Sequence, residues 1–372
     1  MQNKKLAFGM MRLPQLDDNP EHVDLEKTCE MVDAFLQKGY TYFDTSYVYH
    51  NGKSEEFTRK ALVERHPRES FTLATKLPTW AIKSEEDVKR IFAEQLQNCG
   101  VDYFDYYLVH NLNSGFYDNI VTPYHIFEIL SEYKKEGKIK HLGFSVHDAP
   151  EFLERILNEH PEVEFVQIAF NYYDYSAAWV QSKKCYDIIR SHGKLVNIME
   201  PVKGGMLANP PESVQKILKD AEPKMSVASW AIRFAAHLEG IITVLSGMSN
   251  VEQMQDNLSY MKDFKGLTAA EEATLKQAQE ALAKIPLIPC TTCNYCAKVC
   301  PMNIGVSGSF TAMNYYTLYK DLAAAKHQEN WLVTGHGKKK AAECIKCGAC
   351  EKACPQHIKI REELVKVTET LG

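Results

Sequence analysis

The chain has 372 residues, of which 45% are apolar and 24% are charged, and its formal net charge is −5. This composition is typical of globular proteins, and no apolar run approaches the roughly 20 residues needed to span a bilayer. We therefore expect no membrane segment. We also expect a cytoplasmic protein, because the first residues lack the apolar core of a secretory signal.

Short apolar runs alternate with amphipathic stretches along the first 285 residues. The runs predict eight strands, at Leu6–Met11, Thr41–Asp44, Phe71–Lys76, Asp105–His110, Ile139–Phe144, Phe165–Ala169, Lys194–Met199 and Ile241–Leu245. Helical periodicity lies between them, for example at Asp24–Lys38, Ser84–Asn98, Thr122–Glu136, Ala177–Ser191 and Ser226–His237. This alternation over about 280 residues predicts an α/β fold, a (β/α)8 TIM barrel. A doubly wound sheet is the competing interpretation.

Polar side chains stand at the ends of different predicted strands. They are Asp44, Lys76, His110, Ser145 and Gln167. Chemistry in a barrel gathers where the strands end at their carboxyl face, and this spread favours the barrel over the doubly wound sheet. Each residue alone has an ordinary structural explanation, such as a helix cap or a solvated strand end. Together with Tyr49, five residues after Asp44, they form a candidate active site.

Eight of the eleven cysteines lie in two identical runs near the C-terminus. Each run reads Cys-x2-Cys-x2-Cys-x3-Cys-Pro, beginning at Cys290 and at Cys344. This spacing is that of bacterial two-cluster ferredoxins, in which the fourth cysteine of each run ligates the other cluster. We therefore predict two [4Fe–4S] clusters, one bound by Cys290, Cys293, Cys296 and Cys354, the other by Cys344, Cys347, Cys350 and Cys300. A pair of zinc sites is the alternative interpretation.

Charge divides the chain at the same place as the cysteines. Residues 286–372 carry 11 Lys and Arg against 7 Asp and Glu, whereas the remainder carries 32 against 41. We predict a barrel domain at residues 1–284 and a cluster domain at residues 285–372, joined at Ile285–Pro289. Residues 309–329 have helical periodicity, and the tail resembles the α-helical ferredoxin module of respiratory iron–sulfur subunits. The lysine run 338–340 suggests a solvated surface or, alternatively, a docking patch for an acidic partner.

The first domain resembles the aldo-keto reductase family over roughly residues 5–284. The motifs that carry the resemblance are FDTSYVYHNGKSE, LATKLP, YYLVHNLN, GFSVHD, VQIAFNYYD, EPVKGGML and LSGMSNVEQMQDNL. The resemblance implies reduction of aldehydes and ketones with NADP(H) or NAD(H), without a metal at that step. It also implies Tyr49 as the general acid, with Lys76, Asp44 and His110 tuning it. A nearby cation is what a phenol needs to give up its proton near neutral pH.

The resemblance further implies a set of cofactor contacts. Ser145 and Gln167 would hold the nicotinamide carboxamide, and Met199 occupies the position that stacks on the ring. Gly204 and Gly205 would pass over the pyrophosphate. The adenosine end would be lined by Gly247, Ser249, Gln253, Asp256 and Asn257. Gly247 and Gln253 replace cations that often bind the 2′-phosphate of NADPH, so the choice between the two cofactors stays open.

The two parts together predict an oxidoreductase that acts on a small carbonyl or alcohol substrate and carries an electron-transfer module. We expect a redox partner protein and no nucleic acid. The alternative is a nucleotide-binding or docking barrel with little turnover, attached to an electron carrier or redox sensor. A further alternative is that the clusters only keep the tail folded.

Overall fold

The computed structural model describes residues 4–17, 19–175, 180–288, 290, 295–354 and 358–372. Two compact units are present. The first holds most of the chain up to Glu272, and the second holds Asn209–Ala221 and Ala273–Gly372. The predicted boundary at 284/285 follows the end of α11 (Ala269–Ala283), whereas the units divide inside this helix. No helix in the described ranges is long and apolar enough to cross a membrane.

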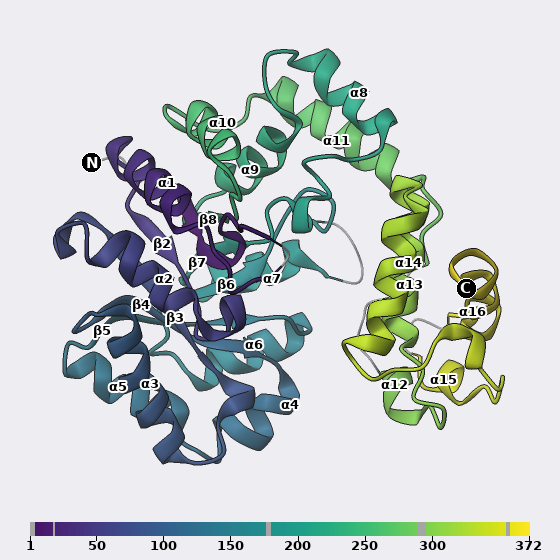
Figure 1. Cartoon of the computed structure of the whole chain (residues 1–372), viewed down its shortest axis with the longest axis horizontal. Helices are drawn as coiled ribbons and strands as arrows, with labels where there is room; N and C mark the ends of the chain where they lie inside the picture. Colours follow the sequence, from purple (N-terminus) through teal and green to yellow (C-terminus); the bar gives the residue numbers. More distant parts are fainter. Residues whose placement is uncertain (1–3, 18, 176–179, 289, 291–294, 355–357) are drawn as a thin grey trace. The chain divides into compact units, whose positions relative to one another are not determined.

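Eight parallel strands close into a barrel in chain order. They are β1 (Leu6–Gly9), β2 (Tyr42–Asp44), β3 (Thr72–Pro78), β4 (Phe104–Leu112), β5 (Ile139–Val146), β6 (Phe165–Ala169), β7 (Leu195–Met199) and β8 (Ile241–Ser246). The pairing of β1 with β8 closes the sheet, so the (β/α)8 prediction is confirmed and the doubly wound alternative is excluded. Figure 1 shows the strands surrounded by helices.

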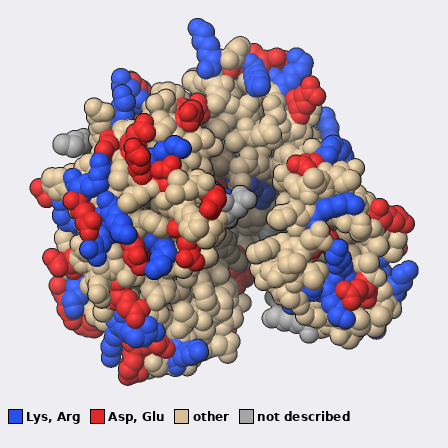
Figure 2. Space-filling view, in the orientation of Figure 1, with Lys and Arg blue, Asp and Glu red and all other residues tan. Residues whose placement is uncertain are grey.

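Helices that follow the strands cover the outside of the barrel. They are α1 (Leu25–Gln37), α2 (Ser54–Thr58), α3 (Glu85–Cys99), α4 (Ser114–Phe116), α5 (Ile126–Lys135), α6 (Pro150–Glu159), α7 (Ser182–Ser191), α9 (Val227–His237) and α10 (Val251–Met261). The helix predicted from Ala177 is described only from Ser182, since residues 176–179 lie outside the described ranges. Acidic and basic side chains are interspersed over the face seen in Figure 2.

The barrel interior is packed with apolar side chains. They include Ala7, Ala74, Leu108 and Ile242, each at most 9% exposed. Gly143 on β5 is required by this packing, because a Cβ there would lie 2.5 Å from the carbonyl oxygen of Phe165. A filled interior leaves the open space at one end of the barrel, where the strands finish.

The second unit is helical. It contains α8 (Glu212–Ala221), α12 (Tyr295–Val299), α13 (Val306–Tyr319), α14 (Leu322–Thr334), α15 (Ala349–Lys352) and α16 (Ile360–Leu371). The helical character predicted for residues 309–329 is confirmed, but the range divides into two helices, because the chain breaks between α13 and α14. Lys320 takes a left-handed backbone conformation, and the Asp321 side chain accepts a hydrogen bond from the Ala324 N–H and caps α14.

Candidate active site and cluster-binding site

The predicted catalytic residues meet at one end of the barrel. Asp44 ends β2, Lys76 lies near the end of β3, His110 lies on β4, and Tyr49 stands in the turn after β2. A cavity of about 700 Å³ is lined by three of these side chains, those of Asp44, Tyr49 and His110. Sequence position therefore predicted the correct end of the fold for all of them.

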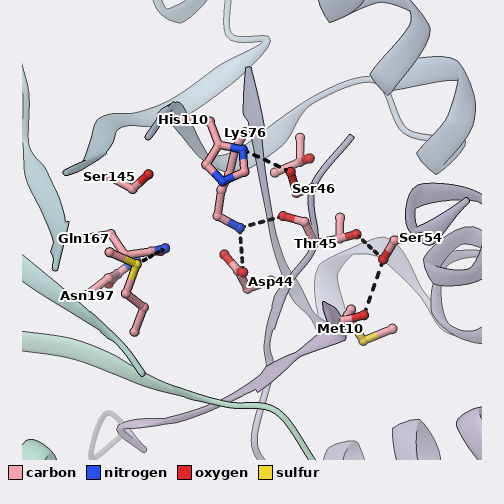
Figure 3. A network of polar contacts seen from close by, with 12 residues as sticks. Met10, Asp44, Thr45, Ser46, Ser54, Lys76, His110, Ser145, Gln167 and Asn197 are labelled. Carbon is pink, nitrogen blue, oxygen red and sulfur yellow. Dashed lines mark hydrogen bonds and ion pairs between the residues drawn. The ribbon is translucent and has the colours of Figure 1, made fainter. Parts of the chain in front are cut away.

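Lys76 and Asp44 form a buried ion pair. The Lys76 Nζ lies 2.6 Å from Asp44 Oδ1 and donates a second hydrogen bond of 2.7 Å to the Thr45 carbonyl (Figure 3). The Lys76 side chain is fully buried. Burial alone would disfavour the ammonium, but Asp44 and Tyr49 together raise the pKa of Lys76 above 10.5. Lys76 is therefore a fixed cation at neutral pH.

Tyr49 lies directly over this cation. The Lys76 Nζ is 5.0 Å from the centroid of the Tyr49 ring. Burial raises the pKa of Tyr49, while the positive charge of Lys76 opposes the rise. The phenol thus keeps its proton at neutral pH, and a cation stands ready to stabilise the phenolate once the proton leaves.

His110 faces the Tyr49 ring edge-on, with the ring centroids 6.2 Å apart. Burial, the nearby Lys76 charge and His147 lower the pKa of His110 to about 3, so the imidazole is neutral. Its Nδ1 lies 3.3 Å from the Ser46 hydroxyl. When Ser46 donates to Nδ1, the proton of the ring sits on Nε2, and His110 can then donate one hydrogen bond.

Ser145, near the end of β5, lies beside Gln167 in the middle of β6, and the two residues pair in register. The Ser145 Oγ accepts a hydrogen bond from the Asn111 N–H at 2.9 Å, which leaves its own proton free to donate. Gln167 Nε2 contacts Met199 Sδ at 3.6 Å, and its buried Oε1 has no hydrogen-bond partner among the described residues. A free donor beside a free acceptor fits a carboxamide group.

The remaining predicted cofactor contacts line the same cavity. They are Gly204, Gly205, Gly247, Ser249, Gln253, Asp256 and Asn257. Gly204 and Gly205 have φ values of +65° and +104°, so this loop needs glycine. The Gln253 Oε1 accepts a hydrogen bond from the Ser249 N–H at 2.8 Å. Asp256 accepts from the Ser226 hydroxyl, and Asn257 donates to Ser246.

Sequence reasoning missed four side chains at this end of the barrel. Arg12, Glu200 and Lys203 line the cavity, and the Trp80 ring lies 5.1 Å from that of His110. Lys203 is held by both carboxylate oxygens of Asp174, at 2.7 and 2.8 Å. All four stand within a few residues after a strand end, and this position is the signal that could have found them.

Four cysteines of the second unit surround a small hollow. Cys300 comes from the first run, and Cys344, Cys347 and Cys350 come from the second. These are the four ligands predicted for one cluster. Backbone N–H groups point at two of the sulfurs, from Ile304 to Cys300 Sγ and from Lys346 to Cys344 Sγ, each at 3.4 Å. Such bonds are among the features that set the potential of an iron–sulfur cluster.

The other predicted set is described only in part, since Cys293 lies outside the described residues. Cys290, Cys296 and Cys354 pack on the apolar core of the second unit. No group of three or more His, Cys, Asp or Glu side chains in the described part of the chain could hold a metal ion.

The model of the aldo/keto reductase family matches residues 5–280. The chain belongs to the aldo/keto reductase family. The barrel and the motifs that carried the predicted resemblance agree with this membership. Residues 289–358 match the model of a 4Fe–4S dicluster domain, so an aldo/keto reductase domain is followed by an iron–sulfur domain.

Characterised members of the family are distant relatives of this aldo/keto reductase. The NADH-specific methylglyoxal reductase of Escherichia coli is 22% identical over 300 residues, covering 68% of this chain and 88% of that protein. The L-galactose dehydrogenase of Arabidopsis thaliana is 26% identical over 265 residues, covering 66% and 81% respectively. Both similarities support oxidoreductase activity as the class of function.

Solved structures of the family share the fold of this aldo/keto reductase. The holo form of AKR11C1 from Bacillus halodurans superimposes with a TM-score of 0.60 at 23% identity, covering 74% of this chain and 91% of that one. A Klebsiella pneumoniae aldo/keto reductase in complex with NADP and acetate gives a TM-score of 0.60 at 18% identity, covering 73% and 90%.

Proposed function

We propose that this protein interconverts a small carbonyl compound and its alcohol by hydride transfer with NADP(H) or NAD(H). The buried Lys76–Asp44 pair beneath Tyr49 is the observation that carries the proposal. The relatives named above, a methylglyoxal reductase and a sugar dehydrogenase, act on small oxygenated compounds and support this substrate class. We place the protein in the cytoplasm, where thiols stay reduced.

The nicotinamide, when bound, supplies the hydride. Ser145 and Gln167 would bind its carboxamide through the free hydroxyl proton and the free amide oxygen described above. Met199, whose sulfur contacts Gln167, would pack beside the nicotinamide. The glycines at 204 and 205 carry no side chain and would let the loop after β7 approach the pyrophosphate.

Tyr49 protonates the substrate oxygen as negative charge develops on it. His110 donates a second hydrogen bond from Nε2 to the same oxygen, which holds the carbonyl against the phenol. The phenolate left on Tyr49 is stabilised by Lys76, whose own charge is fixed by Asp44. In the reverse direction the phenolate accepts the proton of the alcohol, and the same cation favours the charged form.

We assign two [4Fe–4S] clusters to the second unit. One is bound by Cys290, Cys293, Cys296 and Cys354, and the other by Cys344, Cys347, Cys350 and Cys300. A cluster moves one electron, whereas a nicotinamide moves two as a hydride. We infer that the clusters exchange electrons with a redox partner protein.

Steady-state turnover of NAD(P)H with a panel of small aldehydes and ketones tests the enzymatic half. Tyr49→Phe should lower kcat/KM by about 100- to 10,000-fold, the usual contribution of a general acid. Tyr47→Phe is the matched control, because the Tyr47 hydroxyl bonds Glu94 and does not line the cavity. A full rate in Tyr49→Phe excludes this mechanism.

A binding or docking barrel with little turnover is the second candidate. Val146 follows Ser145, where the family usually has a polar residue for the carboxamide, and Val146 is buried. This barrel would therefore hold the nicotinamide by fewer bonds. Saturable NAD(P)H binding without turnover on the whole panel would favour this candidate.

A further inference from the structure

Lysines lie close to the residues that line the hollow formed by Cys300, Cys344, Cys347 and Cys350: Lys346 stands between Ile345 and Cys347 in the chain, and Lys339 pairs with Ile304 in a β-bridge. Residues 336–348 contain Lys338, Lys339, Lys340 and Lys346 but a single acidic residue, Glu343. The rest of the chain, outside residues 286–372, has nine more acidic than basic residues. Positive charge is therefore concentrated beside one predicted cluster in a protein that is acidic as a whole.

Backbone hydrogen bonds fix the lysine run against the cysteine-bearing segments. The Lys339 N–H donates to the Asn303 carbonyl at 3.1 Å, and the Gly305 N–H donates back to the Lys339 carbonyl at 3.2 Å. Asn303 lies three residues after Cys300. At the other end of the run, the Cys344 N–H donates to Ala341. Residues 338–340 thus connect the segment that follows Cys300 to the segment that begins at Cys344.

The loop between Cys344 and Cys347 reaches the surface. Ile345 is 59% exposed, and Lys346 and Cys347 are exposed as well. Ile345 also lines the hollow, but the hollow is too small to hold most of its exposed surface. The side chains of Ile345 and Lys346 therefore face solvent. Electron transfer between proteins needs a short path, and this loop places the predicted ligand Cys347 at the surface, directly after Ile345 and Lys346 in the chain.

These lysines are largely free to meet an outside charge. Lys339 pairs with Glu343 at 3.4 Å, and Lys338 bonds the neutral amide of Asn303 at 2.8 Å. In the part of the chain that the structure describes, no ion pair joins Lys338, Lys340 or Lys346 to a carboxylate. Clustered surface cations of this kind steer acidic partners and speed their association.

We propose that Lys338, Lys339, Lys340, Lys346 and Ile345 form the docking surface for an acidic protein that carries one electron at a time. The inference rests on the proposed clusters and names the chemistry of their partner. In each encounter one reduced cluster loses one electron and the carrier gains it. Complementary charge orients the carrier over the Cys344–Cys347 loop, and Ile345 provides the apolar contact at its centre.

Electron transfer to two carriers of opposite charge tests the surface. The cluster-loaded protein is reduced with dithionite and mixed in stopped flow with an acidic flavodoxin or with the basic cytochrome c, over a range of salt. The rate with flavodoxin should fall steeply with ionic strength, because exposed charges are screened beyond about 10 Å at 0.1 M salt. Titration calorimetry of the oxidised proteins gives the affinity for flavodoxin independently of electron transfer.

Charge reversal supplies the variants. Lys339→Glu with Lys346→Glu should weaken flavodoxin binding and slow its reduction by about tenfold, while cytochrome c is reduced faster. Lys216→Glu is the control, since this lysine is 74% exposed on α8 and should change neither rate. Iron content and the electron paramagnetic resonance signal must match the unaltered protein, which excludes a damaged cluster.

The outcomes separate this inference from the proposed function. Clusters that reduce neither carrier would overturn the electron-exchange role itself. Electrons that pass to both carriers with no effect of salt or of charge reversal would overturn only the docking surface. A double variant that alters NAD(P)H turnover but neither carrier reaction would show that the occupant is the acidic remainder of the same chain, which also overturns an outside partner.

Discussion

The buried pair of Lys76 and Asp44 should behave as one energetic unit. At 2.6 Å and an effective dielectric constant of about 20, two unit charges attract by about 6 kcal/mol, most of which offsets the cost of removing both from water. Lys76→Met or Asp44→Asn leaves the other group buried without its partner. Each change should therefore lower the free energy of unfolding by about 3–5 kcal/mol.

The double variant should lose less than the sum of the two single losses. With both charges gone, no uncompensated charge stays in the barrel, so a coupling energy of at least about 1 kcal/mol is expected for residues in direct contact. Urea unfolding of the four proteins, followed by tryptophan fluorescence, measures this cycle. Trp230 is 1% exposed and reports the barrel.

The dependence of the free energy of unfolding on pH above about 10 gives a second measure of the same ion pair. The pKa of Lys76 is raised in the folded protein, so its contribution is complete below 10.5 and is lost as pH rises through the folded value. Unaltered protein should therefore lose stability in this pH range more steeply than Lys76→Met. Strictly additive single losses, together with the same pH dependence in both proteins, would refute the assignment of an ion pair.

Four further predictions concern other parts of the molecule. Because the pKa of His110 is about 3, the folded state should lose stability as pH falls from 6.5 toward 3, and urea unfolding of His110→Gln should show a weaker dependence in this window. Gly143→Ala should destabilise the barrel by about 1–3 kcal/mol, since the new Cβ meets the Phe165 carbonyl; an unchanged thermal midpoint would contradict the packing. Cys354→Ser should lower the iron content from about eight to about four per chain and spare the resonance signal of the cluster that Cys300 ligates; loss of that signal instead would rule out the predicted cross-ligation. Gln253→Arg should raise the preference for NADPH over NADH by about tenfold in kcat/KM, as expected for one charge-assisted bond to the 2′-phosphate, and an unaltered ratio would place the adenosine end elsewhere.

Local patterns in the sequence were sufficient for the architecture. The alternation of apolar runs with helical stretches predicted the closed barrel. Strands and helices each have a hydrophobic period that can be recognised within a few consecutive residues. The polar residues at strand ends were placed correctly for the same reason, since all parallel strands finish at one face. The cysteine runs predicted an iron–sulfur domain because their spacing is a short-range property of the chain.

Tertiary structure decided what depends on distance between remote residues. The left-handed Lys320 and the cap at Asp321 break the tail helix, although the apolar period continues across them. The ion pair in which Lys203 donates to Asp174 joins two loop positions that are 29 residues apart in the chain. The charge states of Lys76 and His110 follow from burial and from neighbours brought together by the fold, and a pKa of this kind has no local signature in the sequence.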